Sequence, residues 1–279
     1  MKLTFLGTAA AEGIPAVWCN CKVCRAAKER GGRDIRTRSQ VLVGDDLLLD
    51  FPMDTYLHTL QNKLDLSKVD TVLITHAHMD HCYPQEFMLH GSPYAYGMAK
   101  PIVRIYGNEC VKARFEAALA HEITPTVAET VPFTPLHAFT AFTTPSGYTI
   151  TALPANHTKG EECLVYAVTQ GSKTALFLND TGILEEAVYE RAAQMGLKFD
   201  FVAFDCTYGH RQKGVGRHMG SLDALGEREK MQKYALTHAG TKFVLTHFSH
   251  NCELLYDALV EKEEPFGFTV AYDGLTVEL

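Results

Sequence analysis

Long apolar runs are missing from this 279-residue sequence. A membrane-spanning helix needs about 20 consecutive apolar residues, and no stretch approaches that length. The first residues, MKLTFLGTAA, hold one lysine and no apolar core of the kind that secretory signal peptides carry. We therefore expect a cytoplasmic protein without a membrane partner.

Blocks of positive charge and low-complexity segments are missing too. Lysine and arginine number 26 against 33 aspartates and glutamates, so the formal net charge is −7. Nucleic acids are held mainly by clustered lysine and arginine, and the one basic stretch, 25–38, is short. The composition therefore argues against nucleic acid as a partner, and it has no mark of disorder.

The chain does have a large apolar fraction, arranged in strands and helices. Hydrophobic residues make up 46% of it, enough for the core of one α/β domain, so we treat 1–279 as a single domain. KLTFL is predicted as an edge strand, and QVLVG and DLLLD as a hairpin. Strands interspersed with helices predict a layered α/β sandwich. Further strands are expected at 69–75, 102–106, 148–154, 163–169, 174–180, 199–205, 242–247 and around 273–274, and helices at 54–62, 109–121, 184–195, 221–238 and 252–262, with 124–145 as a connection or small flap.

The stretch LITHAHMDHCYPQEF, residues 73–87, concentrates metal-binding side chains directly after a predicted strand. His76, His78, Asp80 and His81 form the pattern H-x-H-x-D-H. A loop can point all of these side chains to one side, whereas a helix or strand of that length would not. Histidine and carboxylate ligands together suit Zn, Mn, Fe or Ni. The pattern therefore predicts a metal site at the end of this strand.

Similar side chains stand alone at the ends of later predicted strands. His157 follows LPAN, Asp180 ends LFLND, and His247 ends KFVLTH. Each by itself can be a hydrogen-bonded histidine or a helix-capping aspartate. Together with the first cluster, they supply the further ligands that a second metal needs.

Three of the eight cysteines are close together in CNCKVC, as Cys19, Cys21 and Cys24. Thiolates at this spacing repel one another unless a cation or oxidation neutralises them, and oxidation is not expected in the cytosol. The cluster therefore predicts a structural zinc with one further ligand.

These motifs resemble those of the metallo-β-lactamase superfamily of dinuclear hydrolases, over nearly the whole chain. The resemblance implies an α/β fold of the four-layer αββα sandwich type, with the metals at one edge of the paired sheets. It also implies which residues hold which metal. One divalent ion would be held by His76, His78 and His157, and the other by Asp80, His81 and His247, with Asp180 bridging.

A narrower resemblance links the chain to the phosphoribosyl cyclic phosphodiesterases of the carbon-phosphorus lyase pathway and their relatives in pyrroloquinoline quinone synthesis. The motifs that carry it are GTAAAEGIPAVWCNCKVC, THAHMDH, LPANHTKG, LNDTG, RHMG and LTHFSH. The family implies a homodimer and a structural zinc in an N-terminal insertion around 19–38. Its fourth ligand would be His250, although Asn251 or Cys252 can approach the same place as judged from the residues alone.

The resemblance also implies a reaction and a general acid. We expect hydrolysis of a small phosphodiester, such as phosphoribosyl 1,2-cyclic phosphate, by a hydroxide that bridges two Mn, Zn, Fe or Ni ions. His218 in GRHMG matches the family's proton donor, and we count Asp80 as catalytic as well as metal-binding. Lys159 and Arg217 are candidates for contact with the phosphate.

Other functions stay open on the sequence. They are a thioester or lactone hydrolase, a cofactor-biosynthesis relative of the pyrroloquinoline quinone type, and a zinc-braced binding protein without catalysis. A transfer-RNA processing nuclease shares the first motif, but this chain has no long basic arm for RNA.

Two stretches depart from the family pattern and predict an altered pocket wall. Cys82 to Glu86 stand where relatives commonly carry glycine, and Asp50-Phe51-Pro52 stands in place of an Asp-Ala-Gly turn. The tyrosine-rich segment 90–101 is expected near the metals, as a substrate lid or as a packed surface loop.

Overall fold

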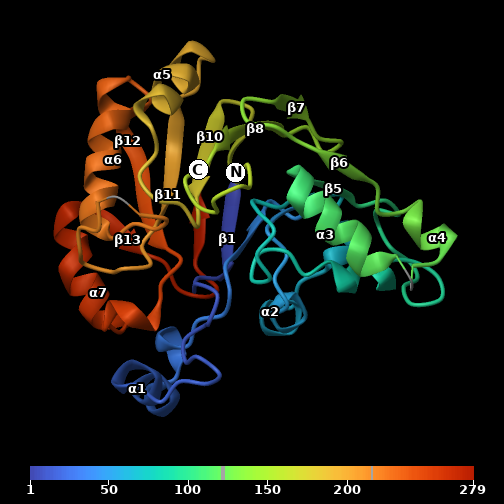
Figure 1. Cartoon of the computed structure of the whole chain (residues 1–279), viewed down its shortest axis with the longest axis horizontal. Coiled ribbons are helices and arrows are strands. Elements are labelled where there is room, and N and C mark those ends of the chain that lie inside the picture. Colours follow the sequence, from blue (N-terminus) through green and yellow to red (C-terminus); the bar gives the residue numbers. More distant parts are fainter. Residues whose placement is uncertain (121–122, 215) are drawn as a thin grey trace.

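The computed structural model describes residues 1–120, 123–214 and 216–279. Two sheets of seven strands each lie face to face, in the orders β14-β1-β2-β3-β4-β5-β6 and β13-β12-β11-β10-β9-β8-β7 (Figure 1). The strands of the first sheet are β1 (Lys2–Gly7), β2 (Gln40–Val43), β3 (Leu47–Leu49), β4 (Thr71–Leu73), β5 (Arg104–Gly107), β6 (Phe133–Pro135) and β14 (Thr276–Glu278). Those of the second are β7 (Ala141–Thr143), β8 (Thr149–Pro154), β9 (Leu164–Gln170), β10 (Lys173–Leu178), β11 (Phe199–Asp205), β12 (Thr237–Thr246) and β13 (Phe268–Val270). The α-helices are α1 (Lys22–Arg30), α2 (Thr55–Asn62), α3 (Glu109–Leu119), α4 (Pro125–Ala128), α5 (Glu186–Gln194), α6 (Ser221–Lys233) and α7 (Tyr256–Glu263).

Alternating side chains give each sheet an inner and an outer apolar face. On β3, Leu47 and Leu49 join the cluster between the sheets, whereas Leu48 joins the cluster outside the first sheet. On β10, Phe177 packs inward and Leu178 packs outward. Helices α5, α6 and α7 cover the outer face of the second sheet, and α3 covers that of the first (Figure 1). The predicted αββα sandwich is therefore confirmed.

The carboxyl ends of many strands lie along one edge of this sandwich. β3, β4 and β5 run parallel in the first sheet, and β10, β11 and β12 run parallel in the second. β8 runs in the same direction as β10, because both pair antiparallel with β9. Where β4 ends, the Tyr166 hydroxyl donates to the Ile74 carbonyl at 2.8 Å, and the Leu164 N–H donates to the Thr75 carbonyl at 2.9 Å. The two sheets are thus joined where the histidine loop begins.

Most of the predicted elements are present, including the hairpin of β2 and β3. The prediction of β1 as an edge strand is wrong, because β14 pairs antiparallel with the side of β1 that β2 leaves open. The segment 124–145 carries α4, β6 and β7, so it is part of the sandwich. None of the helices in the described ranges is long and apolar enough to cross a membrane.

Two of the predicted helices have clearly different boundaries in the structure. α6 ends at Lys233 and not at 238, because Ala235 takes a left-handed φ of 54° and β12 begins at Thr237. α7 begins at Tyr256 and not at 252. Glu253, with a left-handed φ of 64°, ends a 3₁₀ turn over His250–Cys252 and separates this turn from α7. The predicted end of the helix 109–121 lies outside the described residues.

Candidate dinuclear metal site and cysteine cluster

The predicted metal ligands come from loops at the common strand edge. The loop after β4 supplies a cluster, and the loops after β8, β10 and β12 supply one side chain each. Two groups result, each with its ligand atoms within 4.8 Å of one another, and Asp180 belongs to both. The groups are His76, His78, His157 and Asp180, and Asp80, His81, Asp180 and His247.

Asp180 lies between the two groups. Its Oδ2 is 3.2 Å from His76 Nε2, 3.3 Å from His81 Nε2 and 3.8 Å from His247 Nε2. In the first group, His157 Nε2 lies 3.1 Å from His78 Nδ1. A single carboxylate that faces histidines of both groups has the position of a bridging ligand.

Several buried imidazole nitrogens in this space make no hydrogen bond of acceptable geometry, although the Asp180 carboxylate lies near them. Within the described part of the chain they are the Nε2 atoms of His76, His81 and His247. A buried polar atom without a partner is unfavourable, and a bound water or ion is one of its common partners. Imidazole nitrogens around a shared carboxylate are a donor set that suits Zn, Mn or Fe. The residues therefore fit a pair of divalent metals.

Left-handed backbone turns aim some of these side chains. Asp180 has a φ of 55° and His247 a φ of 59°, and Asp50 beside the site has a φ of 60°. Such a φ is uncommon for residues other than glycine and is concentrated at functional sites. Each of these residues follows the end of a strand, so the turn directs its side chain into the strand edge instead of along the sheet face.

Asp50, which directly follows β3, orients His81. Its Oδ2 lies 2.7 Å from His81 Nδ1, while its Oδ1 accepts hydrogen bonds from the Thr75 N–H and hydroxyl at 2.9 Å each. A carboxylate on Nδ1 leaves Nε2 free to face a metal. Sequence reasoning assigned no role to Asp50, although it singled out the unusual Asp50-Phe51-Pro52 turn.

Asp205, the last residue of β11, does the same for two other histidines and was missed by sequence reasoning. Its Oδ2 lies 3.0 Å from His218 Nδ1 and 3.4 Å from His247 Nδ1. His218 Nδ1 also lies 2.9 Å from Asp180 Oδ1. Burial works against a charge on His218, but the two carboxylates outweigh it and raise the pKa of His218 to about 11. The predicted proton donor thus lies beside Asp180, and the two carboxylates favour its protonated form.

The two ligand groups differ in how they hold protons. Burial disfavours charge on Asp80 and Asp180, yet the neighbouring histidines hold the pKa of both carboxyls below the ordinary value. Burial lowers the pKa of His157 to about 4. Burial also opposes charge on His81 and His247, but nearby carboxylates outweigh it and raise the pKa of both. Nearby carboxylates therefore favour charge on His81 and His247, whereas burial favours the neutral form of His157.

The remaining site predictions lie around this centre. Lys159 and Arg217 are exposed, and the Arg217 carbonyl lies 3.1 Å from His157 Nδ1. Their contact with a phosphate stays a prediction. The segment 90–101 borders an apolar cavity of about 480 Å³ on the outer side of the first sheet, with Phe51 and Tyr94 in its wall. Among the described residues that line this cavity there is no predicted metal ligand, and the role of the segment as a substrate lid or a packed surface loop stays a prediction.

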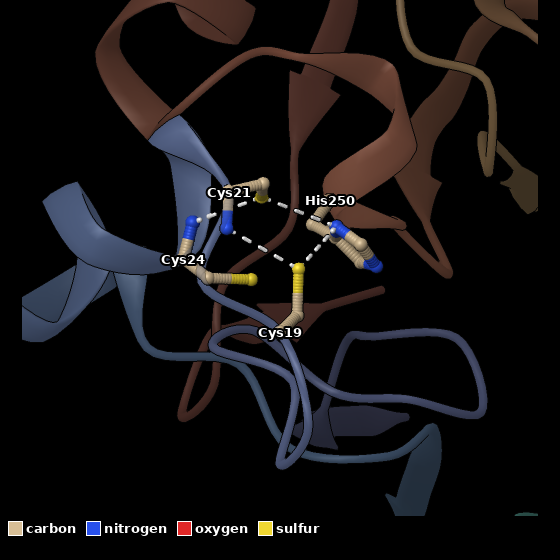
Figure 2. A group of neighbouring side chains, drawn as sticks. All are labelled: Cys19, Cys21, Cys24 and His250. Atoms are coloured by element: carbon tan, nitrogen blue, oxygen red, sulfur yellow. Dashed lines mark hydrogen bonds between the residues drawn. The ribbon is translucent and has the colours of Figure 1, made fainter.

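The cysteine cluster is a separate site at the start of α1 (Figure 2). His250 Nδ1 lies 3.4 Å from Cys21 Sγ and 3.7 Å from Cys19 Sγ, and Cys24 Sγ completes a group whose ligand atoms lie within 4.8 Å of one another. A zinc ion with tetrahedral Zn–S and Zn–N bonds of ordinary length separates S from N by about 3.6 Å. The four side chains face one another, so they fit a structural zinc (Figure 2).

The structure also separates the candidates for the fourth zinc ligand. Cys252, which sequence reasoning left open, is buried with its Sγ 3.6 Å from the Leu254 carbonyl, and Asn251 is exposed.

The Cys21 thiol of this cluster ionises more readily than an ordinary cysteine. A hydrogen bond from the Cys24 N–H, helped by His250, lowers the pKa of the Cys21 thiol to about 6. A thiol that ionises this readily is suited to metal binding.

Comparison with known proteins agrees with this arrangement. Residues 48–248 match the family described as the Beta-lactamase superfamily domain. The chain belongs to the metallo-β-lactamase superfamily. The match spans the predicted dinuclear ligands from His76 to His247, and the family together with these ligand groups marks the chain as a metal-binding hydrolase of the metallo-β-lactamase fold.

Relatives within the superfamily point in two directions. The chain is 26% identical over 301 residues to a coenzyme PQQ synthesis protein B of Methylorubrum extorquens, with 100% of both chains covered. A solved diphosphatase of the PhnP family is 24% identical, with a TM-score of 0.73 and coverage of 100% and 96%. Zn(2+)-bound PqqB from Methylobacterium extorquens is 21% identical, with a TM-score of 0.71 and full coverage of both chains. The solved structures establish the shared fold.

Proposed function

We propose that this chain hydrolyses a small phosphodiester, with a cyclic sugar phosphate such as phosphoribosyl 1,2-cyclic phosphate as the leading candidate substrate. The observation that carries the proposal is the pairing of two ligand groups through Asp180, with His218 Nδ1 beside them at 2.9 Å from Asp180 Oδ1. The side chain of His218 is 23% exposed, whereas that of Asp180 is 3% exposed, so His218 stands at the solvent side of the site. The resemblance of the sequence to the phosphodiesterases supports the same reaction.

When bound, two divalent metals would lower the pKa of a water and neutralise the charge of the phosphate oxygens. His76, His78 and His157 would hold one metal, Asp80, His81 and His247 the other, and Asp180 would contact both. The protein's own part is then to orient these ligands and to supply a proton.

His218 is the residue placed to deliver that proton. A departing sugar alkoxide is a strong base and must be protonated as the P–O bond breaks. Asp205 and Asp180 hold Nδ1 of His218, which leaves its other ring nitrogen to reach the leaving oxygen. Lys159 and Arg217, exposed on neighbouring loops, would attract the phosphate groups of the substrate.

The test is phosphorus NMR of the purified, Mn-loaded protein with ribose 1,2-cyclic phosphate 5-phosphate, with an Asp180→Ala variant as control. Conversion to the ring-opened bisphosphate by the parent and not by the variant is the expected result. If the parent holds its metals and leaves this substrate intact but opens bis(p-nitrophenyl) phosphate, the phosphodiesterase class stands and the sugar phosphate is wrong.

The second candidate is a reaction of the pyrroloquinoline quinone type, which the full-length similarity to the PQQ synthesis protein favours. A metal-loaded protein that hydrolyses neither phosphodiester would support this candidate. Hydrolysis of thioesters alone would instead place the chain among ester hydrolases of the same fold.

A further inference from the structure

Ala77 lies between the ligands His76 and His78, and side chains bind both its backbone N–H and its backbone carbonyl. The Ala77 N–H donates to Glu161 Oε1 at 2.8 Å. The Ala77 carbonyl accepts from Arg114 Nη1 at 2.8 Å. Because a short peptide joins the two histidines, whatever fixes this peptide also fixes the direction of both imidazoles.

Glu161 belongs to the loop that carries the third ligand of the same group, His157. The two ligand loops follow strands of different sheets, β4 and β8, and the backbone hydrogen bond from the Leu164 N–H to the Thr75 carbonyl joins them only at their base. The Glu161 carboxylate bridges them, and it also accepts a hydrogen bond from Asn108 Nδ2 at 2.9 Å. Asn108 is anchored in turn as the N-cap of α3, where its Oδ1 accepts from the Val111 N–H at 2.9 Å.

A second contact joins the same two loops nearer the ligands. The Thr158 hydroxyl lies 3.2 Å from His78 Nε2. A hydroxyl that accepts from Nε2–H keeps Nδ1 of His78 unprotonated, and Nδ1 is the atom that faces His157. Thr158 can do this only while its loop stays docked on the histidine loop, and Glu161 contributes to that docking beside the backbone hydrogen bond from Leu164 to Thr75.

The other ligand group is oriented by different residues. His81 is held by Asp50 at 2.7 Å, and His247 by Asp205 at 3.4 Å and by the Thr207 hydroxyl at 2.9 Å. Among the residues that the structure describes, Glu161 makes no hydrogen bond to any of these side chains. Loss of Glu161 should therefore affect the two metals unequally.

We propose that Glu161 is a positioning residue that sets the affinity of the metal held by His76, His78 and His157, and leaves the metal held by Asp80, His81 and His247 unaffected. The inference rests on the proposed ligand assignment but not on the proposed substrate. Removal of a residue that orients metal ligands typically lowers metal affinity by about 10- to 100-fold. We expect a loss of that size for one metal in Glu161→Ala.

The chain supplies a matched control in the adjacent residue. Glu162 has the same charge and lies on the same loop, but its carboxylate accepts from the Ala138 N–H and contacts His137 Nδ1, both at 2.8 Å, at an exposed surface. Glu162→Ala thus removes one negative charge from the loop without touching the histidine peptide. Glu161→Gln is the rescue variant, because an amide oxygen can still accept from the Ala77 N–H.

The experiment is a chelator titration of the Co(II)-loaded full-length protein, followed by visible absorption and by the cobalt content after each step. The parent is expected to release two active-site metals in steps, and the step that disappears in His157→Ala identifies the metal of the His76 group. In Glu161→Ala this step should shift by about 10- to 100-fold in chelator concentration, with recovery in Glu161→Gln and no shift in Glu162→Ala.

Three outcomes would overturn the proposal. Equal weakening of both steps in Glu161→Ala means that Glu161 supports the fold in general. Unchanged steps mean that the two loops dock without it. A parent that binds no active-site metal removes the ligand assignment itself, whereas a parent that binds two metals but has no phosphodiesterase activity leaves this inference intact.

Discussion

Replacement of Asp205 by asparagine is a sharp test of how the second ligand group is oriented. Asp205 Oδ1 accepts hydrogen bonds from the Thr207 and Met219 N–H groups at 2.9 and 3.1 Å. Oδ2 faces the Nδ1 atoms of His218 and His247. Asparagine can keep the first oxygen and its two backbone contacts, and it exchanges only the second for a hydrogen-bond donor. The Asp205→Asn variant should therefore fold and lose the acceptor for both histidines.

The size of the effect follows from what remains around His247. With Nε2 on a metal, Nδ1 carries a hydrogen and needs an acceptor. The Thr207 hydroxyl, 2.9 Å from this Nδ1, can still serve. We therefore expect the lower end of the usual range, about a 10-fold loss of metal affinity, or about 1.4 kcal/mol. His218 keeps the Asp180 carboxylate and the Thr207 hydroxyl but loses one of its two neighbouring carboxylates, so its pKa should fall from about 11.

The assay is chelator competition with the metal-loaded protein, with Asp200→Asn as control. Asp200 lies on the same strand but binds Lys173 Nζ at 2.7 Å and the Thr174 N–H at 3.0 Å. In Asp205→Asn, the affinity for the metal of the His247 group should fall. In Asp200→Asn, this affinity should stay at the parent value. Parent-like affinity in Asp205→Asn would refute the reasoning, as would an equal loss in both variants.

Three further predictions test other parts of the molecule. Asp180→Ala should abolish hydrolysis and lower metal content below two active-site ions per chain, measured by elemental analysis; two retained ions would exclude Asp180 as the bridge. Cys24→Ser should remove the structural zinc and lower the thermal unfolding midpoint by about 5 °C or more, and a parent-like zinc content would contradict the cysteine site. Burial lowers the pKa of His58 from 6.5 to about 4, so the fold holds it neutral. The contribution of neutral His58 to the free energy of unfolding is complete above pH 6.5 and is lost as the pH falls toward 4, by about 3 kcal/mol in total. In His58→Gln, the free energy of unfolding from urea titrations should lose that much of its pH dependence, and an unchanged slope would show that His58 does not titrate as described.

The sequence predicted the ligand residues that the structure brings together better than it predicted their surroundings, for physical reasons. His76 to His81 are close in the chain, so their pattern is visible without knowledge of the fold. Asp180 and His247 were found because each ends an apolar run. Asp205 also ends such a run, but its contact with His247 depends on the parallel register that pairs Asp205 with Thr246. A register between strands cannot be read from one sequence.

The same limit explains the error about β1. Its amino-acid pattern is that of a short strand with one open side, and the strand that fills this side lies at the far end of the chain. The docking of Glu161 on the Ala77 peptide was hidden for a related reason, because it joins loops of two different sheets. Local chemistry is readable from the residues, whereas contacts made by tertiary packing are not.

The interior position of β1 has a consequence for biosynthesis. A ribosome makes β1 long before β14, yet the two strands are neighbours in the finished sheet. During most of translation, the side of β1 that will pair with β14 is an uncovered strand edge, which is a template for wrong pairing with other chains. The nascent protein thus depends on keeping this edge solvated or shielded until β14 emerges, and shortened chains that lack β14 are expected to aggregate.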